Sequence, residues 1–204
     1  FKNKVIIMTT KDEGGWTGLD TWIMSSDNII CTNQEITVKD KLKCCAYGET
    51  TVGAGRAEWD LRIDFESFGG ICIGLWCHNL KNKNNLQELP LDEHFAYEPN
   101  GYGYTNKTGT LTHDGERKRY GLRYKHGDIL TMRLDLMSRE LSYKINGKDQ
   151  GIAYDNLPKG AYRLSIKLQF AEQKVSILRF WTSLGKGKTI PDIPSQKKLN
   201  NNNN

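Results

Sequence analysis

The chain of 204 residues is long enough for one domain with a substantial core, which needs neither disulfides nor a metal to fold. Its formal net charge is +5, but the four Lys and one Asp of residues 186–204 account for +3 of it. The +2 left on the globular part argues against a nucleic-acid-binding protein. No apolar run reaches the ~18 residues that cross a bilayer, and no basic-then-apolar leader is seen, so we expect a soluble, intracellular protein without membrane contact.

The two ends of the chain differ from its middle. The sequence starts at Phe1 and ends in five consecutive Asn residues, so we interpret it as part of a longer polypeptide. After residue 184 Gly, Lys, Pro, Ser and Asn predominate, which is typical of a tail or linker. We therefore expect one domain over residues 1–184 and a polar tail over residues 185–204.

Short apolar segments separated by Gly, Asp, Asn and Ser open the chain and predict strands joined by turns. They read KVIIM, DTWIM, DNIICT and KLKCCA. From Ala57 to Phe65 apolar and polar residues alternate without interruption, with Phe65 on the apolar side, as in a strand with one buried face. The segment ICIGLW, residues 71–76, is almost continuously apolar, which indicates a central strand.

Cysteine and histidine residues show no pattern typical of catalysis or metal binding. The five cysteines form no CxxC pair, and the four histidines lack the spacing of a zinc site. Cys77 and His78 are adjacent, but neighbouring residues of a strand point to opposite faces. The sequence predicts reduced core thiols, no metal, no cofactor and no enzymatic activity.

A long polar segment lies between two predicted strands, from residue 78 to residue 100. Ordered loops on a rigid sheet scaffold are common binding sites. The second half of this segment contains Leu89, Leu91, Phe95 and Tyr97, enough apolar surface to fold back onto the sheets. An unstructured insertion is the alternative.

The clearest strand pattern follows in the second half of the chain. ILTMRLDL (129–136) and LSYKI (141–145) alternate with a period of two, and the Asn-Gly dipeptide after LSYKI suits a type I′ hairpin turn. YRLSIKLQF (162–170) predicts another strand with one buried face, and KVSILRF predicts one more. Without any convincing helical period, these segments predict an all-β fold, an antiparallel two-sheet β-sandwich with little helix.

A basic run with two tyrosines, from Arg117 to Lys125, precedes these strands. It is the best argument in the sequence for a nucleic-acid interface. We interpret it as a solvated face of a strand or loop, because the globular part carries little net charge.

Five ordered blocks of the chain resemble the SPRY domain, found in TRIM-type ubiquitin ligases, ryanodine receptors and Ran-binding scaffold proteins. AEWDLRID resembles the YWEVxV strand of that family, ICIGLW its xxIGL strand and GYGYTNKTG its SYGYxxxxG block. RYGLRYKHGDILTMRLDL and LSYKINGKDQGIAYDNLP resemble the two blocks that follow. The resemblance covers residues 57–180, and the spacing of its Gly-Asp, Asn-Gly and GIAY elements is specific.

The resemblance implies a non-catalytic protein-interaction module, an adaptor or scaffold domain of a larger protein, that binds a short peptide or a protein surface through edge loops. It places an aromatic pocket residue at Tyr97, five residues before Tyr102, and a basic one at Lys107. Two arginine positions of the same pocket fall on Cys72 and Thr105, which implies a less acidic partner. The predicted peptide-binding residues are Tyr97, Lys107, Leu91, Phe95, Glu98, Asn100, Thr105 and Phe170.

Several alternatives stay open at this point. A lectin-like sandwich would bind carbohydrate through exposed aromatic residues such as Trp16 or Trp22. A purely structural spacer would expose no aromatic cleft, and an enzyme would depend on Cys77 and His78. Tyr97 suits two roles, as a ligand contact or as an anchor of its loop to the core. In each case we expect a monomeric domain.

Overall fold

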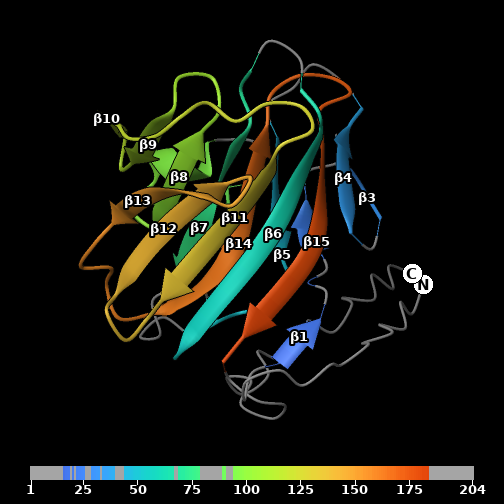
Figure 1. Ribbon diagram of the computed structural model, residues 1–204. Helices are drawn as coiled ribbons and strands as arrows, with labels where there is room; N and C mark the ends of the chain where they lie inside the picture. The colour runs from blue at the N-terminus through green and yellow to red at the C-terminus, as the bar shows by residue number, and fades with distance from the viewer. Residues whose placement is uncertain are drawn as a thin grey trace, which may run out of the picture.

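A computed structural model shows two layers of β-strands packed face to face (Figure 1). Within the described part of the chain no helix is long and apolar enough to cross a membrane. The segment KVIIM and the predicted tail lie outside the described residues. The structure describes residues 16–18, 20, 22–25, 29–32, 34–39, 44–66, 69–78, 89–90 and 94–183, with only the backbone of 16–18 and 23–25.

The front layer in Figure 1 is sheet A, an antiparallel sheet of eight strands. In spatial order they are β13 (Lys148–Tyr154), β12 (Glu140–Ile145), β11 (Ile129–Asp135), β6 (Arg56–Phe65), β15 (Lys174–Thr182), β4 (Glu35–Val38) and β3 (Ile29–Cys31), with β1 (Trp16–Gly18) paired to β15. β6 lies inside the sheet because its alternating sequence gives it one fully apolar face, formed by Ala57, Trp59 and Leu61. The turn between β12 and β13 has φ values of 49° and 78° at Asn146 and Gly147, as predicted for a type I′ turn.

The rear layer is sheet B, an antiparallel sheet of seven strands. In spatial order they are β10 (Glu116–Arg119), β9 (Thr110–His113), β8 (Gly101–Thr105), β7 (Cys72–His78), β14 (Ala161–Leu168), β5 (Cys44–Gly48) and β2 (Trp22–Ser25). The apolar segment ICIGLW forms β7 at the centre of this sheet, which confirms its predicted place. A single turn of 3₁₀ helix, η2 (Phe95–Tyr97), precedes β8. The predicted all-β, antiparallel two-sheet sandwich is confirmed.

Tyrosine side chains fill much of the space between the sheets and connect them by hydrogen bonds. The hydroxyl of Tyr143 donates to the carbonyl of Ile73 at 3.1 Å. The hydroxyl of Tyr154 lies 2.8 Å from the carbonyl oxygens of both Gly103 and Thr112. Burial raises the pKa of Tyr143 and Tyr154 well above the ordinary value, so both hydroxyls stay protonated donors. These bonds join strands of sheet A to the carbonyls of sheet B.

Replacing Tyr154 by Phe is expected to lower the free energy of unfolding by about 1–2 kcal/mol, because the carbonyls of Gly103 and Thr112 lose the one hydroxyl proton that they share. Chemical denaturation measures the loss. Tyr120→Phe is the matched control, since the Tyr120 hydroxyl donates to the carbonyl of Gly151 near solvent, where water replaces it. An equal loss in both variants would show that Tyr154 does not connect the sheets in this way.

Two burial predictions are wrong. All eight residues of β14 are buried, including the polar Arg163, Ser165 and Lys167 that the period-two pattern assigns to a solvent face. The reason is a second apolar layer, described below, that covers the outer face of sheet B. Phe65, predicted to point into the core, is 40% exposed at the end of β6, where the register with β15 becomes irregular.

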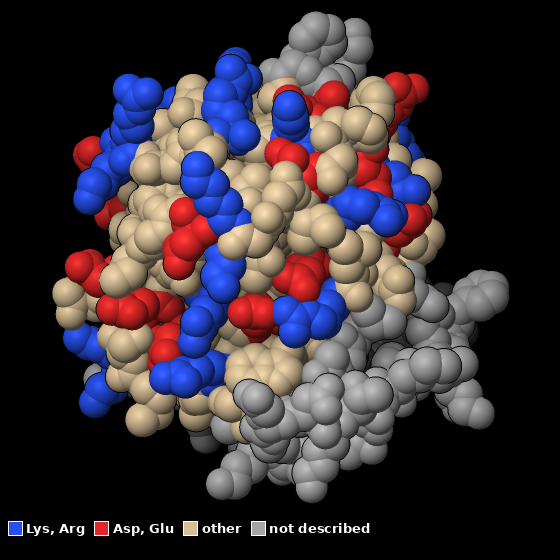
Figure 2. Space-filling model, viewed as in Figure 1, with Lys and Arg blue, Asp and Glu red and all other residues tan. Residues whose placement is uncertain are grey.

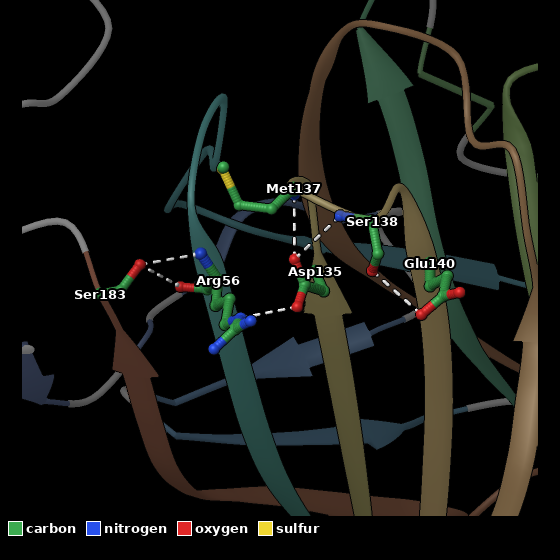
Figure 3. A network of polar contacts seen from close by, with 6 residues as sticks. All are labelled: Arg56, Asp135, Met137, Ser138, Glu140 and Ser183. Atoms are coloured by element: carbon green, nitrogen blue, oxygen red, sulfur yellow. Dashed lines mark hydrogen bonds and ion pairs between the residues drawn. The ribbon is translucent and has the colours of Figure 1, made fainter.

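Asp135 organises the turn that follows β11 (Figure 3). One of its carboxylate oxygens accepts from the backbone N–H groups of Met137 at 2.9 Å and Ser138 at 3.2 Å, and the other accepts from Arg56 at 2.6 Å. Partial burial raises the pKa of Asp135, but these donors outweigh it, so the pKa lies below its usual value. The backbone N–H of Arg56 donates in turn to the Ser183 hydroxyl at 2.8 Å. The polar groups of this network bind one another, which indicates a structural role.

Candidate functional site

A second apolar cluster lies on the outer face of sheet B, the face turned away from sheet A. The covering segment, defined here as residues 89–90 and 94–98, contributes Leu89, Phe95 and Ala96 to it. The Tyr47 hydroxyl donates to the carbonyl of Pro90 at 2.9 Å and fixes the start of the segment. The prediction that this segment folds back onto the sandwich is confirmed for its described residues. The sheet contributes Cys45, Tyr47, Cys72 and Trp76.

Two glycines of β8 allow the covering segment to lie directly on the sheet. A Cβ atom at Gly101 would lie 1.8 Å from the carbonyl oxygen of Phe95. A Cβ atom at Gly103 would lie 2.8 Å from the Cβ of Ala96 and 2.4 Å from the sulfur of Cys72. Only residues without a side chain fit at these positions. The place of η2 is therefore set by close backbone packing.

Tyr97 is the exposed member of η2. Tyr97 is 41% exposed, whereas Phe95 and Ala96 have no exposed surface. The ring stacks on His94 with 4.4 Å between ring centroids. The guanidinium of Arg117 donates to the Tyr97 hydroxyl and lies 5.5 Å from the centroid of the ring, within the range of a cation–π contact. Tyr97 is thus held in one orientation at the surface.

The other predicted residues of the covering segment support its shape. Phe95 was expected to contact a peptide, but it is fully buried and anchors η2 instead, which corrects that prediction. The N–H of Glu98 donates to the carbonyl of Phe95 at 3.2 Å, and the carbonyl of Asn100 accepts from Cys77 at 2.8 Å. These bonds form the turn into β8. Leu91 lies outside the described residues.

Three further predicted residues form a separate group at the end of β8. Thr105 is half-buried in the last position of the strand, and Lys107 is exposed in the turn that follows. Phe170 is half-buried, and a Cβ atom at Gly70 would lie 3.1 Å from its ring. A Cβ atom at Gly69 would lie 3.0 Å from the Cβ of Lys107. Lys107 and Phe170 therefore border the same glycine pair.

Tyr97 adjoins β10, the edge strand of sheet B, to which the sequence assigned no binding role, whereas Thr105 of the second group lies two strands further in. In register, Arg117 faces Thr112 and Arg119 faces Thr110, which places both arginine side chains on the outer face with Tyr97. Residues 106–126 contain six Lys or Arg and two Asp or Glu. Figure 2 shows Lys and Arg gathered at the upper left, the region where Figure 1 places β9 and β10. The basic run in the sequence was the only signal for this surface.

The outer face of sheet A has a different electrostatic character. Arg179 contacts Asp60 at 2.7 Å and also bonds to Glu58, and Lys174 contacts Glu35 at 2.8 Å. Figure 2 shows positive and negative side chains interspersed over this face. Because its charges neutralise one another, this face carries no strong field for a charged ligand.

The structure separates the residues on which the enzyme alternative depends. Cys77 lies in the core between the sheets, where burial raises the pKa of its thiol, whereas His78 accepts a bond of 2.7 Å from Arg163 on the outer face. Trp22 packs half-buried against the core, and only the backbone of Trp16 is described. Within the described ranges no group of three or more His, Cys, Asp or Glu residues could hold a metal ion.

Comparisons with known proteins agree with this architecture. The family model of the SPRY domain matches residues 56–179. The dual specificity protein kinase splA of Dictyostelium discoideum is 33% identical over 113 residues, which make up 52% of this chain and 4% of that kinase. The matched segment is thus a small part of a much longer relative.

Two solved human structures have the same fold. The SPRY domain of human HERC1 superimposes with a TM-score of 0.62 and 19% identity, over 75% of this chain and 92% of that domain. A second human SPRY domain gives a TM-score of 0.59 and 16% identity, over 74% and 94%. The family match extends from the start of β6 almost to the end of β15 and leaves out β1 to β5. The chain therefore belongs to the SPRY domain family, whose members are generally protein-interaction modules.

Proposed function

We propose that this domain is a non-catalytic module that captures a peptide segment or protein surface at Tyr97 and the adjoining basic edge of sheet B. The observation that carries the proposal is the contrast within η2, where Tyr97 is 41% exposed and its neighbours Phe95 and Ala96 are completely buried. An aromatic ring on a rigid support loses little conformational entropy when a partner packs against it.

The surroundings of Tyr97 support this role over that of a loop anchor. Phe95 and Ala96 already fix the segment to sheet B, so the stability of the segment does not require the ring of Tyr97. His94 and Arg117 orient that ring from two directions. Interfaces are enriched in Tyr and Arg, because both side chains combine apolar area with hydrogen-bonding groups.

Three further predicted contacts extend the proposed surface. Thr105 and Lys107 at the end of β8 and Phe170 after β14 would contact the same partner. We propose that the domain acts as an adaptor or scaffold element of a larger intracellular protein and that it is monomeric. Because function resides in sites that vary on a common fold, the identity of the partner depends on the whole polypeptide.

Replacing Tyr97 by Ala tests the proposal. Capture of the partner from a cell extract, quantified by pulldown and mass spectrometry, is expected to fall at least about tenfold. The free energy of unfolding should change by less than about 1 kcal/mol, because the side chain is partly solvated. Tyr97→Phe, which keeps the ring and loses the bond from Arg117, should retain most of the capture. Unchanged capture by Tyr97→Ala, or a large loss of stability, would contradict the proposal.

A further inference from the structure

β10 is an edge strand of sheet B whose outer side has no partner strand among the described residues. It pairs with β9 through a turn at residues 114–115, where φ values of 47° and 76° are those of a type I′ hairpin. In such a hairpin His113 and Glu116, which flank the turn, form two backbone hydrogen bonds with each other. From there along the strands, pairs without backbone hydrogen bonds alternate with hydrogen-bonded pairs. The N–H and C=O groups of Arg117 and Arg119 are therefore directed away from β9.

The hydrogen bond from Tyr120 to Gly109 confirms this alternation. The N–H of Tyr120 donates to the Gly109 carbonyl at 3.1 Å, so the next hydrogen-bonded position after Lys118 is Tyr120. The backbone N–H and C=O of Arg119, between them, therefore point away from β9. All four residues of β10 are exposed. The edge thus presents two donors and two acceptors, spaced as a neighbouring strand requires, at the two positions whose arginine side chains share a face with Tyr97.

We propose that the partner contributes an extended acidic segment that adds to sheet B as a strand beyond β10, with acidic side chains at alternate positions opposite Arg117 and Arg119. This inference rests on the proposed function, because Arg117 bonds to Tyr97, and it names the chemistry and the binding mode of the partner. Backbone pairing at a sheet edge supplies affinity, and alternate side chains supply specificity.

The charges of this edge favour an acidic segment, although the two arginine positions of the family's pocket are Cys72 and Thr105 here and add no positive charge. Six Lys or Arg against two Asp or Glu in residues 106–126 attract an acidic chain, and opposite charges on directly facing strand residues stabilise the pairing. A second copy of β10 would place Arg or Lys opposite Arg or Lys, which is destabilising. The basic residues thus disfavour pairing of this edge with a second copy of itself and favour pairing with an acidic strand. A nucleic acid suits the edge less well than a peptide strand, since phosphates accept hydrogen bonds but donate none to the two outward carbonyls.

Amide hydrogen exchange followed by NMR tests the pairing directly. The probe is a synthetic octapeptide of alternating Thr and Glu, and its counterpart of alternating Thr and Lys is the control. The acidic peptide at millimolar concentration is expected to slow exchange at the amides of Arg117 and Arg119 and to leave those of Glu116 and Lys118, already directed at β9, unchanged. The effect should weaken as salt is added. Protection by the Lys peptide, or none by the Glu peptide, would overturn the proposal.

Two substitutions at one position separate charge from backbone. Arg119→Ala removes the side chain and keeps the outward N–H, so binding of the acidic peptide should weaken about fivefold. Arg119→Pro also removes that N–H while leaving the ladder to β9 intact, and it should weaken binding at least about fivefold further. Melting temperatures of both variants verify folding, and Lys159→Ala, an exposed position in the loop before β14, should bind like the unmodified domain. Equal binding by the Ala and Pro variants would exclude strand addition.

The failure of this inference is distinguishable from failure of the proposed function. If Tyr97→Ala loses capture of the partner while Arg119→Pro captures it as well as Arg119→Ala does, the site stands and strand addition is wrong. If the acidic peptide protects Arg117 and Arg119 while Tyr97→Ala captures normally, strand addition stands and the role of Tyr97 is wrong. Binding of single-stranded oligothymidylate in place of the peptide would overturn the choice of a protein partner.

Discussion

Gly101→Ala is expected to destabilise the domain by about 3–5 kcal/mol and to remove the covering segment from sheet B. The added Cβ would lie 1.8 Å from the carbonyl oxygen of Phe95 and 2.9 Å from the Cα of Ala96. Both are backbone atoms, so no side-chain rotation relieves the clash. The segment must lift off, and the ring of Phe95, now fully buried, becomes exposed.

Thiol labelling with mass spectrometry reports this displacement at named positions. Cys45 and Cys72 lie beneath the covering segment, and burial raises the pKa of each thiol to about 12, so both should resist alkylation in the unmodified domain. Both should react quickly in Gly101→Ala, and partner capture should fall as it does for Tyr97→Ala.

The control for Gly101→Ala is Gly147→Ala in the turn after β12. That glycine has a φ of 78° and open space around its missing Cβ, so alanine there is strained but makes no clash. We expect a loss of about 1–2 kcal/mol and no labelling of Cys45 or Cys72. Unlabelled cysteines and unchanged stability in Gly101→Ala would show that η2 does not rest on β8 as described.

The stability of the domain should depend on pH through His78. The ring nitrogen Nε2 of His78 accepts a bond of 2.7 Å from Arg163, whose guanidinium also donates to the carbonyl of Gly48 at 2.9 Å and to the hydroxyl of Thr51 at 3.0 Å. Burial, and secondly the charge of Arg163, lower the pKa of His78 from 6.5 to about 4. A protonated His78 could not accept this bond and would place a second positive charge beside Arg163.

The direction of the effect follows from proton binding. Between pH 6.5 and about 4 the unfolded chain binds a proton at His78 that the folded domain does not, so unfolding is favoured as the pH falls. The contribution of His78 to the free energy of unfolding is complete above pH 6.5 and is lost progressively toward pH 4. It amounts to about 3 kcal/mol at most.

His78→Gln isolates this contribution from that of the carboxylates, which also titrate at low pH. The amide oxygen of Gln accepts the bond from Arg163 without titrating. Urea denaturation at a series of pH values should show a shallower fall in stability for the variant than for the unmodified domain. Parallel curves would show that His78 is not held neutral by its surroundings.

The strands and turns of this domain were largely predictable from local pattern. The alternation in β6 and β11 placed Trp59, Leu61 and Met132 in the core, and the Asn-Gly pair fixed the hairpin between β12 and β13. Each of these features depends on neighbours within a few residues, through the period of two or a required positive φ. The family resemblance also predicted Tyr97 as a binding residue, which stays a prediction; the structure shows that Tyr97 is exposed.

The sequence alone determined the two-sheet sandwich, whereas only the tertiary structure decided what covers each face of the sheets. The alternation in β14 shows which residues share a side, but Arg163 and Lys167 are buried beside Trp76, Cys72 and Cys45, residues of the apolar cluster that the covering segment completes. The same contact buries Phe95 and brings Tyr97 to Arg117 of β10. Periodicity reports local geometry, and long-range packing determines which of the resulting faces meets solvent, the core or a partner.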